Sequence, residues 1–388
     1  MRDLKRLALA HHDRIVAIRR DLHRIPEPAY TEKKTSSYVA SKLEDLKLIV
    51  ETGLARFGVV GLLETGRPGK TLLIRADMDA LPVTENTGLP FSSENEGVMH
   101  ACGHDAHMAM VLGTAAALAE IKEEFSGNIK FVFQPAEEGP GGAKPMIEQG
   151  VMDDPVVDYS LGCHVWPGIP QGTIGVKAGK LMAAMDRFDI LIKGHGCHGA
   201  MPHMGVDALE IGTRVVNALQ RIVSREMNPL SPAVITVGQF NSGTTFNVIP
   251  AEAKMCGTTR TFDREVWESW KDRLEELLSG ICGAHGAEYE LDFQRGYPPL
   301  INDSEMAELA AAAAAETVGA KNVLVPEPTM GGEDMAFYLE RSKGCFVFIG
   351  TGKPGCASLH NPCFDLDESI LSSGVEYFCR MALKLLGA

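Results

Sequence analysis

At 388 residues, with 45% hydrophobic and 23% charged residues, the chain has the size and composition of a soluble globular protein with two domains. Its net charge of -14 disfavours a nucleic-acid backbone or an anionic membrane as a partner. The sequence contains no run of 18 apolar residues, so we expect no transmembrane helix. We also expect no signal peptide, because the N-terminus is charged. Nine cysteines without framework spacing are typical of a reducing compartment, so we expect a cytoplasmic protein.

Helical and β-rich patterns alternate through the first half of the chain. Helical periodicity covers residues 3–24 and 31–47, with a break at Pro26-Glu-Pro28. We then expect strands at 59–63, 71–74, 129–133 and 159–163, and helices at 104–120 and 143–149. Alternation of this kind indicates an α/β layer architecture around a largely parallel sheet.

A second unit is predicted from Asp186 onward. We expect strands at 188–193, 233–238, 251–256 and 289–293, and helices at 207–225 and 264–281. The first pattern resumes with a helix at 303–317 and a strand at 345–349. We therefore predict that residues 186–291 form a domain inserted into a catalytic domain made of residues 1–185 and 292–388.

The segment His100-Ala-Cys-Gly-His-Asp-Ala-His107 is the most informative motif of the chain. Thiolate, imidazole and carboxylate groups bind borderline transition metals, and Cys102 and His104 are close enough to reach one ion. An Ala-rich segment follows and predicts a buried helix, so the motif lies where a loop enters that helix. The alternative for this segment alone is a capping Asp or His beside a cysteine of the core.

Four of the expected strands lead into further residues that can bind metals. In an open α/β sheet, ligands bind beyond the carboxyl ends of the strands. The residues that follow these strands are Asp77 and Asp79, Glu137 and Glu138, His164, and His360. Each has an ordinary explanation by itself, such as an acidic turn or a solvated loop histidine, but their combination with the cysteine–histidine motif favours a metal site.

The candidate ligands are Cys102, His104, Glu138, His164 and His360. Five N, O and S donors exceed the four of a structural zinc and suit a two-metal site with open positions. Adjacent glutamates on an extended loop cannot both face one ion well, so one is a ligand and the other can take a proton from metal-bound water. Because metal lowers the pKa of that water to about 7, hydrolysis at neutral pH needs no protein nucleophile.

These residues belong to longer motifs that resemble the M20 metallopeptidase/amidohydrolase family. The likeness is to its hippurate hydrolase and N-acyl-amino-acid amidohydrolase branch, which includes auxin-conjugate hydrolases. It covers nearly the whole chain, in order. The motifs are Arg75-Ala-Asp-Met-Asp-Ala-Leu-Pro82, Met99-His-Ala-Cys-Gly-His-Asp-Ala-His-Met108, Gln134-Pro-Ala-Glu-Glu-Gly139, Cys163-His-Val-Trp-Pro167, Gly196-Cys-His-Gly-Ala-Met-Pro-His203, Asn247-Val-Ile-Pro250, Gly257-Thr-Thr-Arg-Thr-Phe-Asp263 and Gly332-Glu-Asp-Met335.

The resemblance implies a zinc-exopeptidase-like, three-layer catalytic domain with an inserted α+β, ferredoxin-like domain that serves as lid and dimerisation domain. The five ligands would hold two divalent ions (Zn, Mn, Ni or Co), and Glu137 would be the general base and acid. Asp79 would support the catalytic centre. His198 would stabilise the oxyanion, in some relatives from the neighbouring subunit. Asn247 and Arg260 would hold the substrate, and Arg260 would bind the carboxylate group of the substrate.

Some neighbouring residues are assigned other roles. Many family members have a histidine where this chain has Asp77, so Asp77 is not counted as a ligand. His107 could orient a ligand. Cys356 and Cys363 flank His360, and a role for them as zinc ligands stays open, although the lack of a close second pair argues against it.

The sequence therefore predicts a metal-dependent hydrolase that cleaves hippurate-like N-acyl-amino acids to a carboxylic acid and a free amino acid. A dipeptidase or carboxypeptidase using the same site is the nearest alternative. A catalytically inactive binding protein and a structural zinc protein are others, and the absence of a Gly-x-Ser-x-Gly elbow disfavours a serine hydrolase. We expect a small-molecule substrate and a possible homodimer or higher homo-oligomer through the inserted domain. The acyl group, the metal and the oligomeric state stay open.

Overall fold

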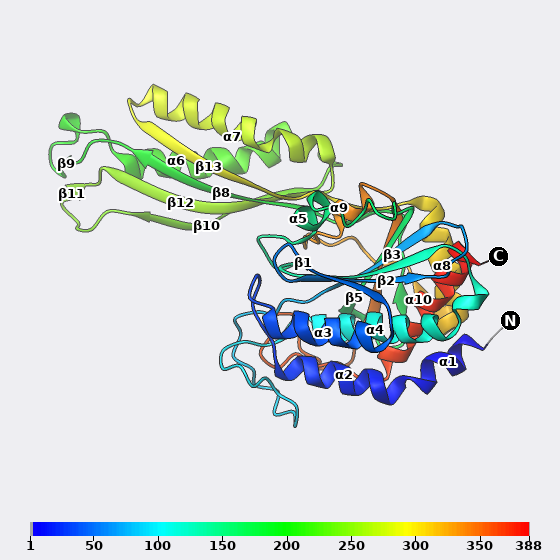
Figure 1. The fold of residues 1–388 in the computed structure, drawn as a ribbon. Coiled ribbons are helices and arrows are strands. Elements are labelled where there is room, and N and C mark those ends of the chain that lie inside the picture. Colours follow the sequence, from blue (N-terminus) through cyan, green and yellow to red (C-terminus); the bar gives the residue numbers. More distant parts are fainter. Residues whose placement is uncertain (1–2, 388) are drawn as a thin grey trace. The chain divides into compact units, whose positions relative to one another are not determined.

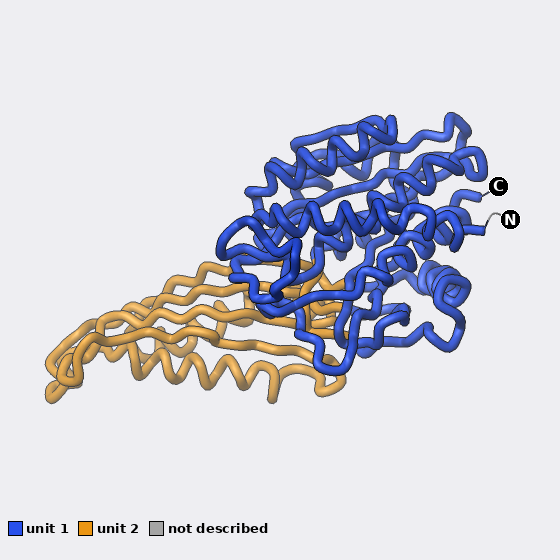
Figure 2. The backbone as a smooth tube through the Cα atoms, turned by 90° about the horizontal axis from the view of Figure 1, so that it is seen from below, with its two compact units in different colours: residues 1–181, 301–327, 334–388 blue, residues 182–300, 328–333 orange. Residues whose placement is uncertain are grey.

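The structure, a computed structural model, describes residues 3–387. The chain forms two compact units, shown in different colours in Figure 2. Unit 1 comprises Met1–Leu181, Ile301–Glu327 and Asp334–Ala388, and unit 2 comprises Met182–Leu300 and Pro328–Glu333. Unit 2 thus begins four residues before residue 186, where we expected the inserted domain to start, and it extends beyond residue 291, where we expected that domain to end.

Unit 1 is built around an eight-stranded sheet. In spatial order its strands are β1 (Ile49–Leu54), β2 (Gly58–Glu64), β4 (Asn128–Gln134), β3 (Thr71–Asp77), β5 (Tyr159–Pro170), β16 (Lys343–Gly352), β6 (Ile174–Gly175) and β15 (Val323–Leu324). Its helices are α1 (Leu4–Ala10), α2 (His12–Arg24), α3 (Lys33–Asp45), α4 (His104–Glu120), α5 (Ala143–Glu148), α8 (Ser304–Val318), α9 (Ala336–Leu339) and α10 (Ile370–Leu386). A separate two-stranded sheet pairs β7 (Gly179–Met182) with β14 (Leu300–Asn302).

The central strands β4, β3, β5 and β16 are mutually parallel. Their carboxyl ends therefore meet at one edge of the sheet, and β3 is buried along its whole length because both faces of the sheet are covered. The mixed α/β fold is confirmed, but the parallel arrangement is limited to the centre. β1 and β2 add an antiparallel hairpin at one edge, and β6 runs antiparallel to β16.

Helix α4 lies in the middle of unit 1 (Figure 1). It packs against β3 and contacts α2, α3 and α10, so it is buried from His104 to Leu118. This position explains its alanine-rich sequence, since alanine favours the helix and allows close packing on all sides. The residue before it, Gly103, has a φ of 84°, a conformation that only glycine adopts readily, and the chain thus turns sharply into the helix.

Unit 2 has a four-stranded antiparallel sheet in the order β10 (Ala233–Ser242), β12 (Glu252–Thr261), β8 (Ala184–Lys193) and β13 (Glu288–Tyr297). Helices α6 (Ala208–Arg221) and α7 (Arg264–Ala284) complete a βαββαβ order, which is the ferredoxin-like arrangement. The expected helix to residue 225 continues as a π-helical segment, Ile222–Glu226. The strands β9 (Cys197–His198) and β11 (Val248–Ile249) form a small separate pair.

Among the described residues, no helix has the length and apolar character needed to cross a membrane.

Candidate metal centre and active site

The candidate ligands predicted from the sequence lie together at the carboxyl edge of the central strands of unit 1. Cys102 precedes α4 and His104 begins it, Glu138 follows β4, His164 lies on β5, and His360 follows β16. Donor atoms of Cys102, His104 and His164 lie within 4.8 Å of one another, and the same holds for Cys102, Glu138 and His360. Cys102 belongs to both groups, so its sulfur is a candidate ligand in each.

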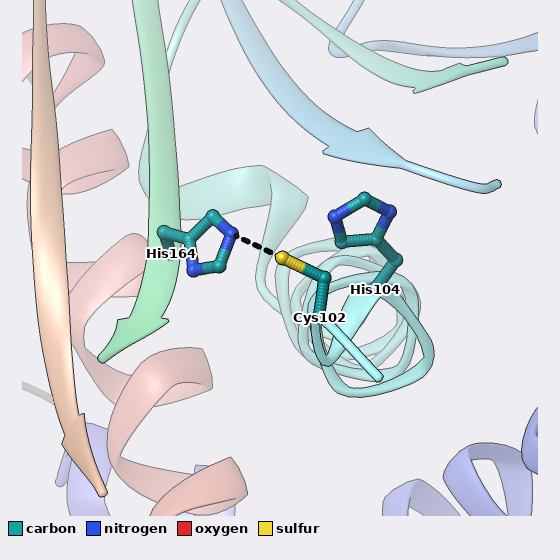
Figure 3. Close-up of side chains that lie close together, drawn as sticks. All are labelled: Cys102, His104 and His164. Atoms are coloured by element: carbon teal, nitrogen blue, oxygen red, sulfur yellow. Dashed lines mark hydrogen bonds between the residues drawn. The ribbon is translucent and has the colours of Figure 1, made fainter. Parts of the chain in front are cut away.

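Cys102 and His164 are spaced as two ligands of one ion would be (Figure 3). The sulfur lies 3.4 Å from His164 Nε2, close to the separation of roughly 3.5 Å that metal–sulfur and metal–nitrogen bonds give in a tetrahedral site. The other ring nitrogen, Nδ1, lies 2.7 Å from the carbonyl oxygen of Val165. That carbonyl can only accept, so Nδ1 carries the proton and Nε2 keeps its lone pair for a metal. Burial lowers the pKa of His164 to about 3, so the ring is neutral at pH 7.

His104 is held in the same way and presents an unsatisfied nitrogen. Its Nδ1 donates to the carbonyl oxygen of Asp79 at 2.8 Å. Its Nε2 is buried, has no hydrogen-bond partner among the described residues, and lies 4.0 Å from Glu138 Oε1. Burial alone would lower the pKa of His104, but the carboxylates of Asp77, Asp79 and Glu138 raise it to about 10. The site therefore favours positive charge, which a divalent ion would supply.

His360 reaches the site from an exposed loop. Its Nε2 is 3.1 Å from Glu138 Oε1, within the spacing of about 2.9–3.4 Å that nitrogen and oxygen ligands of one ion show. The backbone N–H of His360 donates to the carbonyl oxygen of Ala101 at 2.8 Å, which ties this loop to the segment carrying Cys102. Burial and the carboxylates of Glu138 and Glu137 raise the pKa of the Cys102 thiol well above its usual range, so a metal that binds here would have to displace the thiol proton.

Asp77 and His107 are engaged with each other and with neighbouring groups. Asp77 accepts from Arg75 Nη1 and from His107 Nδ1, both at 2.7 Å. The second ring nitrogen of His107 accepts from the backbone N–H of Val165 at 2.9 Å. His107 therefore fixes the strand residue next to His164, and this contact would orient His164 if it binds a metal.

Asp79 holds the loop that carries the two glutamates. Its Oδ1 accepts from the N–H of Glu137 and its Oδ2 from the N–H of Glu138, each at 2.9 Å. Donor atoms of His104, Glu137 and Glu138 also lie within 4.8 Å of one another. A buried Glu137 thus lies beside the candidate ligands, where a general base is needed.

The three candidates in unit 2 are not all close together. His198 on β9 lies opposite Val248 of β11, and the N–H of Gly199 donates to the carbonyl oxygen of Asn247 at 2.8 Å, so His198 and Asn247 are neighbours. Arg260 lies near the far end of β12. About 26 Å of strand separate it from Glu252, the residue at the β9–β11 end.

Arg260 is half-buried and makes no ion pair with a described residue. Its guanidinium donates to the carbonyl oxygen of Thr259 at 2.9 Å, and burial lowers its pKa.

Sequence reasoning missed several buried side chains that support the centre. Asp334 accepts from Arg75 Nη2 at 2.7 Å and from the N–H groups of Gly142 and Ala143 at 3.0 Å. Glu32 accepts from the N–H of Ala136 at 2.9 Å. The only signal in the sequence was that Asp334 lies in a Gly-Gly-Glu-Asp motif, and nothing distinguished Glu32 from a solvated residue.

Comparison with known proteins identifies the family. The profile described as Peptidase family M20/M25/M40 matches residues 73–384. The chain belongs to the M20 peptidase family.

Relatives and solved structures agree with this membership. The chain is 45% identical over 304 residues to the N-acyl-L-amino acid amidohydrolase of Geobacillus stearothermophilus, covering 78% of this chain and 82% of that protein. It is 41% identical over 379 residues to thermostable carboxypeptidase 1 of Saccharolobus solfataricus, with 96% and 95% covered. A Bacillus subtilis crystal structure described as a dinuclear metal binding peptidase from the M20 family superposes with a TM-score of 0.84 at 36% identity, covering 97% and 99%. The protein is thus an M20 hydrolase, and the residue groups described above could hold its metal ions.

Proposed function

We propose that the protein hydrolyses the amide bond of N-acyl-amino acids, with two divalent ions held by Cys102, His104, Glu138, His164 and His360. The observation that carries this proposal is the convergence of those five donors beside Glu137. The buried Nε2 of His104, which has no hydrogen-bond partner among the described residues, and the spacing of Cys102 and His164 both fit a metal.

Divalent ions bound here would supply Lewis acidity, which lowers the pKa of a water molecule to about 7. The Glu137 carboxylate accepts the proton that water loses as its oxygen attacks the amide carbonyl. As the C–N bond breaks, the same carboxyl group gives that proton to the leaving amine, so one residue is base and then acid. His198 stabilises the developing oxyanion, a contact worth about 3 kcal/mol in comparable sites.

Arg260 is proposed to bind the substrate carboxylate, because an arginine without an ion pair offers two parallel donors for that group. Asn247 is proposed to contact the substrate beside His198. A small acyl-amino acid cannot span the length of β12, so one chain's Arg260 and His198 cannot contact the same substrate if unit 2 is rigid. We therefore propose that His198 and Asn247 act from a second copy of the chain, with unit 2 serving as lid and dimerisation domain.

The test is hydrolysis of a substrate panel by metal-stripped protein with Zn, Mn, Co or Ni added back. The panel contains hippurate, N-acetyl-amino acids and dipeptides. Metal-dependent release of free amino acid from the N-acyl compounds is expected. Preference for dipeptides would favour the second candidate, a peptidase, to which the carboxypeptidase relative points. No release while two metals are bound would overturn the proposal.

The role of Glu137 is tested by Glu137→Gln, with metal content measured on the same sample. We expect turnover to fall by about 100-fold or more while both metals stay bound, since a general base contributes 10²–10⁴-fold. The matched control is Glu148→Gln, which removes an exposed carboxylate of α5 in the same unit. Turnover close to wild type in Glu137→Gln would refute the assigned role.

A further inference from the structure

The turn between α2 and α3 holds both ends of the loop that carries Glu137 and Glu138. From this turn, the Tyr30 hydroxyl donates to the carbonyl oxygen of Gly141 at 2.8 Å. Glu32 Oε1 accepts from the N–H of Ala136 at 2.9 Å. Within the loop, the N–H of Gly141 donates to the carbonyl oxygen of Ala136 at 3.0 Å. The loop from 136 to 141 is thus closed on itself, and each end is attached to the same turn.

These attachments fix the backbone next to the proposed general base. The backbone N–H groups of three consecutive residues donate hydrogen bonds to buried carboxylates. The N–H of Ala136 donates to Glu32, and those of Glu137 and Glu138 donate to Asp79. Ala136 has a φ of 58°, a left-handed conformation that residues other than glycine rarely adopt. Contacts from outside the loop must therefore maintain it, and Glu32 makes the contact to Ala136 itself.

Glu32 has no comparable role in its own helix. It occupies the N-cap position of α3, yet its side chain makes no capping hydrogen bond. The N–H groups of Lys34 and Thr35 are satisfied by Glu27 instead, at 2.8 and 2.9 Å. Glu32 is fully buried, and its second oxygen has no hydrogen-bond partner among the described residues. Such burial is unfavourable for a carboxylate and raises the pKa of Glu32 to about 7.

A buried acid that does not cap its own helix, but holds the residue before the base, points to function. We propose that Tyr30 and Glu32 are positioning residues for Glu137, acting through the backbone at Gly141 and Ala136. This inference rests on the proposed function, because it takes Glu137 as the general base. Neither side chain needs to touch substrate or metal.

The first test is steady-state kinetics of Glu32→Ala, Glu32→Gln and Tyr30→Phe on a substrate that the wild type hydrolyses. Misplacing a reacting group by about 1 Å can lower the rate about 100-fold, so we expect kcat of Glu32→Ala to fall roughly 30- to 100-fold with KM changed less than about threefold. Glu32→Gln keeps an oxygen that can accept from Ala136 and should recover most of kcat. Tyr30→Phe loses one hydrogen bond at the far end of the loop and should lower kcat less.

The control for lost stability is Asp303→Ala. Asp303 caps α8 in the same unit by accepting from the N–H of Met306 at 2.9 Å, so the variant destabilises the fold without touching the loop. It should lower the unfolding midpoint and leave kcat unchanged. If Glu32→Ala lowered only the midpoint and kept kcat within twofold, Glu32 would be merely structural and the inference would be overturned.

Hydrogen exchange at residues 136–138 tests the attachment without relying on activity. These amides should be protected in the wild type and in Glu32→Gln, and the amide of Ala136 should exchange at least tenfold faster in Glu32→Ala. Unchanged exchange would overturn the inference whatever the substrate. If the wild type hydrolysed no member of the panel but exchange changed as expected, the proposed function would fail while the attachment stood.

Discussion

Gly103 is the residue on which the convergence of Cys102 and His104 depends most directly, and Gly103→Ala is the sharpest test of that geometry. Its φ of 84° lies in the left-handed region, where a side chain costs about 1–2 kcal/mol. A Cβ at this position would also overlap Cγ2 of Val165, the neighbour of His164. Overpacking of a dense core typically costs a further 1–3 kcal/mol. The free energy of unfolding should therefore fall by about 2–5 kcal/mol.

A second glycine separates the two contributions. Gly97 has a φ of 78°, and a Cβ there would have no atom within 4 Å, so Gly97→Ala measures the backbone term alone. We expect it to lower stability by about 1–2 kcal/mol. The excess in Gly103→Ala then reports the overlap with Val165.

The assay is urea unfolding of both variants in metal-stripped form, followed by a metal titration against a competing chelator. Because relief of the overlap must move Val165 or the segment joining Cys102 to His104, metal affinity should fall at least tenfold in Gly103→Ala and stay near wild type in Gly97→Ala. Equal stability losses in the two variants, with unchanged metal affinity, would refute the reasoning. Such results would show that Val165 can move away without loss of stability, and that Gly103 is needed only for its left-handed backbone conformation.

Three further predictions follow from the buried contacts. His107→Phe removes the acceptor of the Val165 N–H, and a chelator titration should show metal affinity lowered by about 10- to 100-fold, whereas unchanged affinity would remove His107 from the support of the centre. Arg75→Met leaves two buried aspartates without their cation and should lower stability by about 3–5 kcal/mol in thermal or urea unfolding. Burial alone would lower the pKa of His23, but the nearby Asp105 raises it to about 9. Its contribution, up to about 3 kcal/mol, is therefore complete below pH 6.5 and is lost as the pH rises through 9. A His23→Gln variant should flatten this profile of unfolding free energy against pH, and a wild-type profile flat from pH 6.5 to 9.5 would contradict the assignment.

Elements of the fold could be predicted where the apolar residues of a segment repeat with a clear helix or strand period. Helix α4 begins at His104 and ends at Glu120, as the sequence predicts, because a long alanine-rich segment leaves little ambiguity. Strand β5 continues to Pro170, past the predicted end at residue 163, because its ladder with β16 extends that far. His164 therefore lies within a strand and not after one.

Several elements of the fold received no prediction, among them β1 and α10. β1 is an exposed edge strand whose burial pattern does not alternate, so only its pairing with β2 defines it. α10 is largely buried and its apolar residues repeat with a helical period, so the sequence carried a signal for this helix that was not used.

The candidate ligands could be predicted because their chemistry lies in the residue types themselves. Thiol, imidazole and carboxylate groups at strand ends are visible in a sequence. The residues that hold them are not. Glu32 contacts a residue 104 positions away and Tyr30 one 111 positions away, and no local pattern marks Glu32 as buried or either residue as a contact of this loop. Only the folded chain shows that an acid in an exposed-looking turn supports the site.

The pair Glu137–Glu138 shows how the fold changes a rule that holds for an extended chain. Neighbouring side chains of a strand point to opposite faces, so both carboxylates could not serve one centre in that conformation. In this structure the two oxygens of Asp79 accept from the N–H groups of Glu137 and Glu138. The two N–H groups therefore lie on the same side of the backbone. The left-handed Ala136 turns the chain before them. Both carboxylates consequently lie near His104, which allows the proposed roles of ligand and general base to fall on adjacent residues.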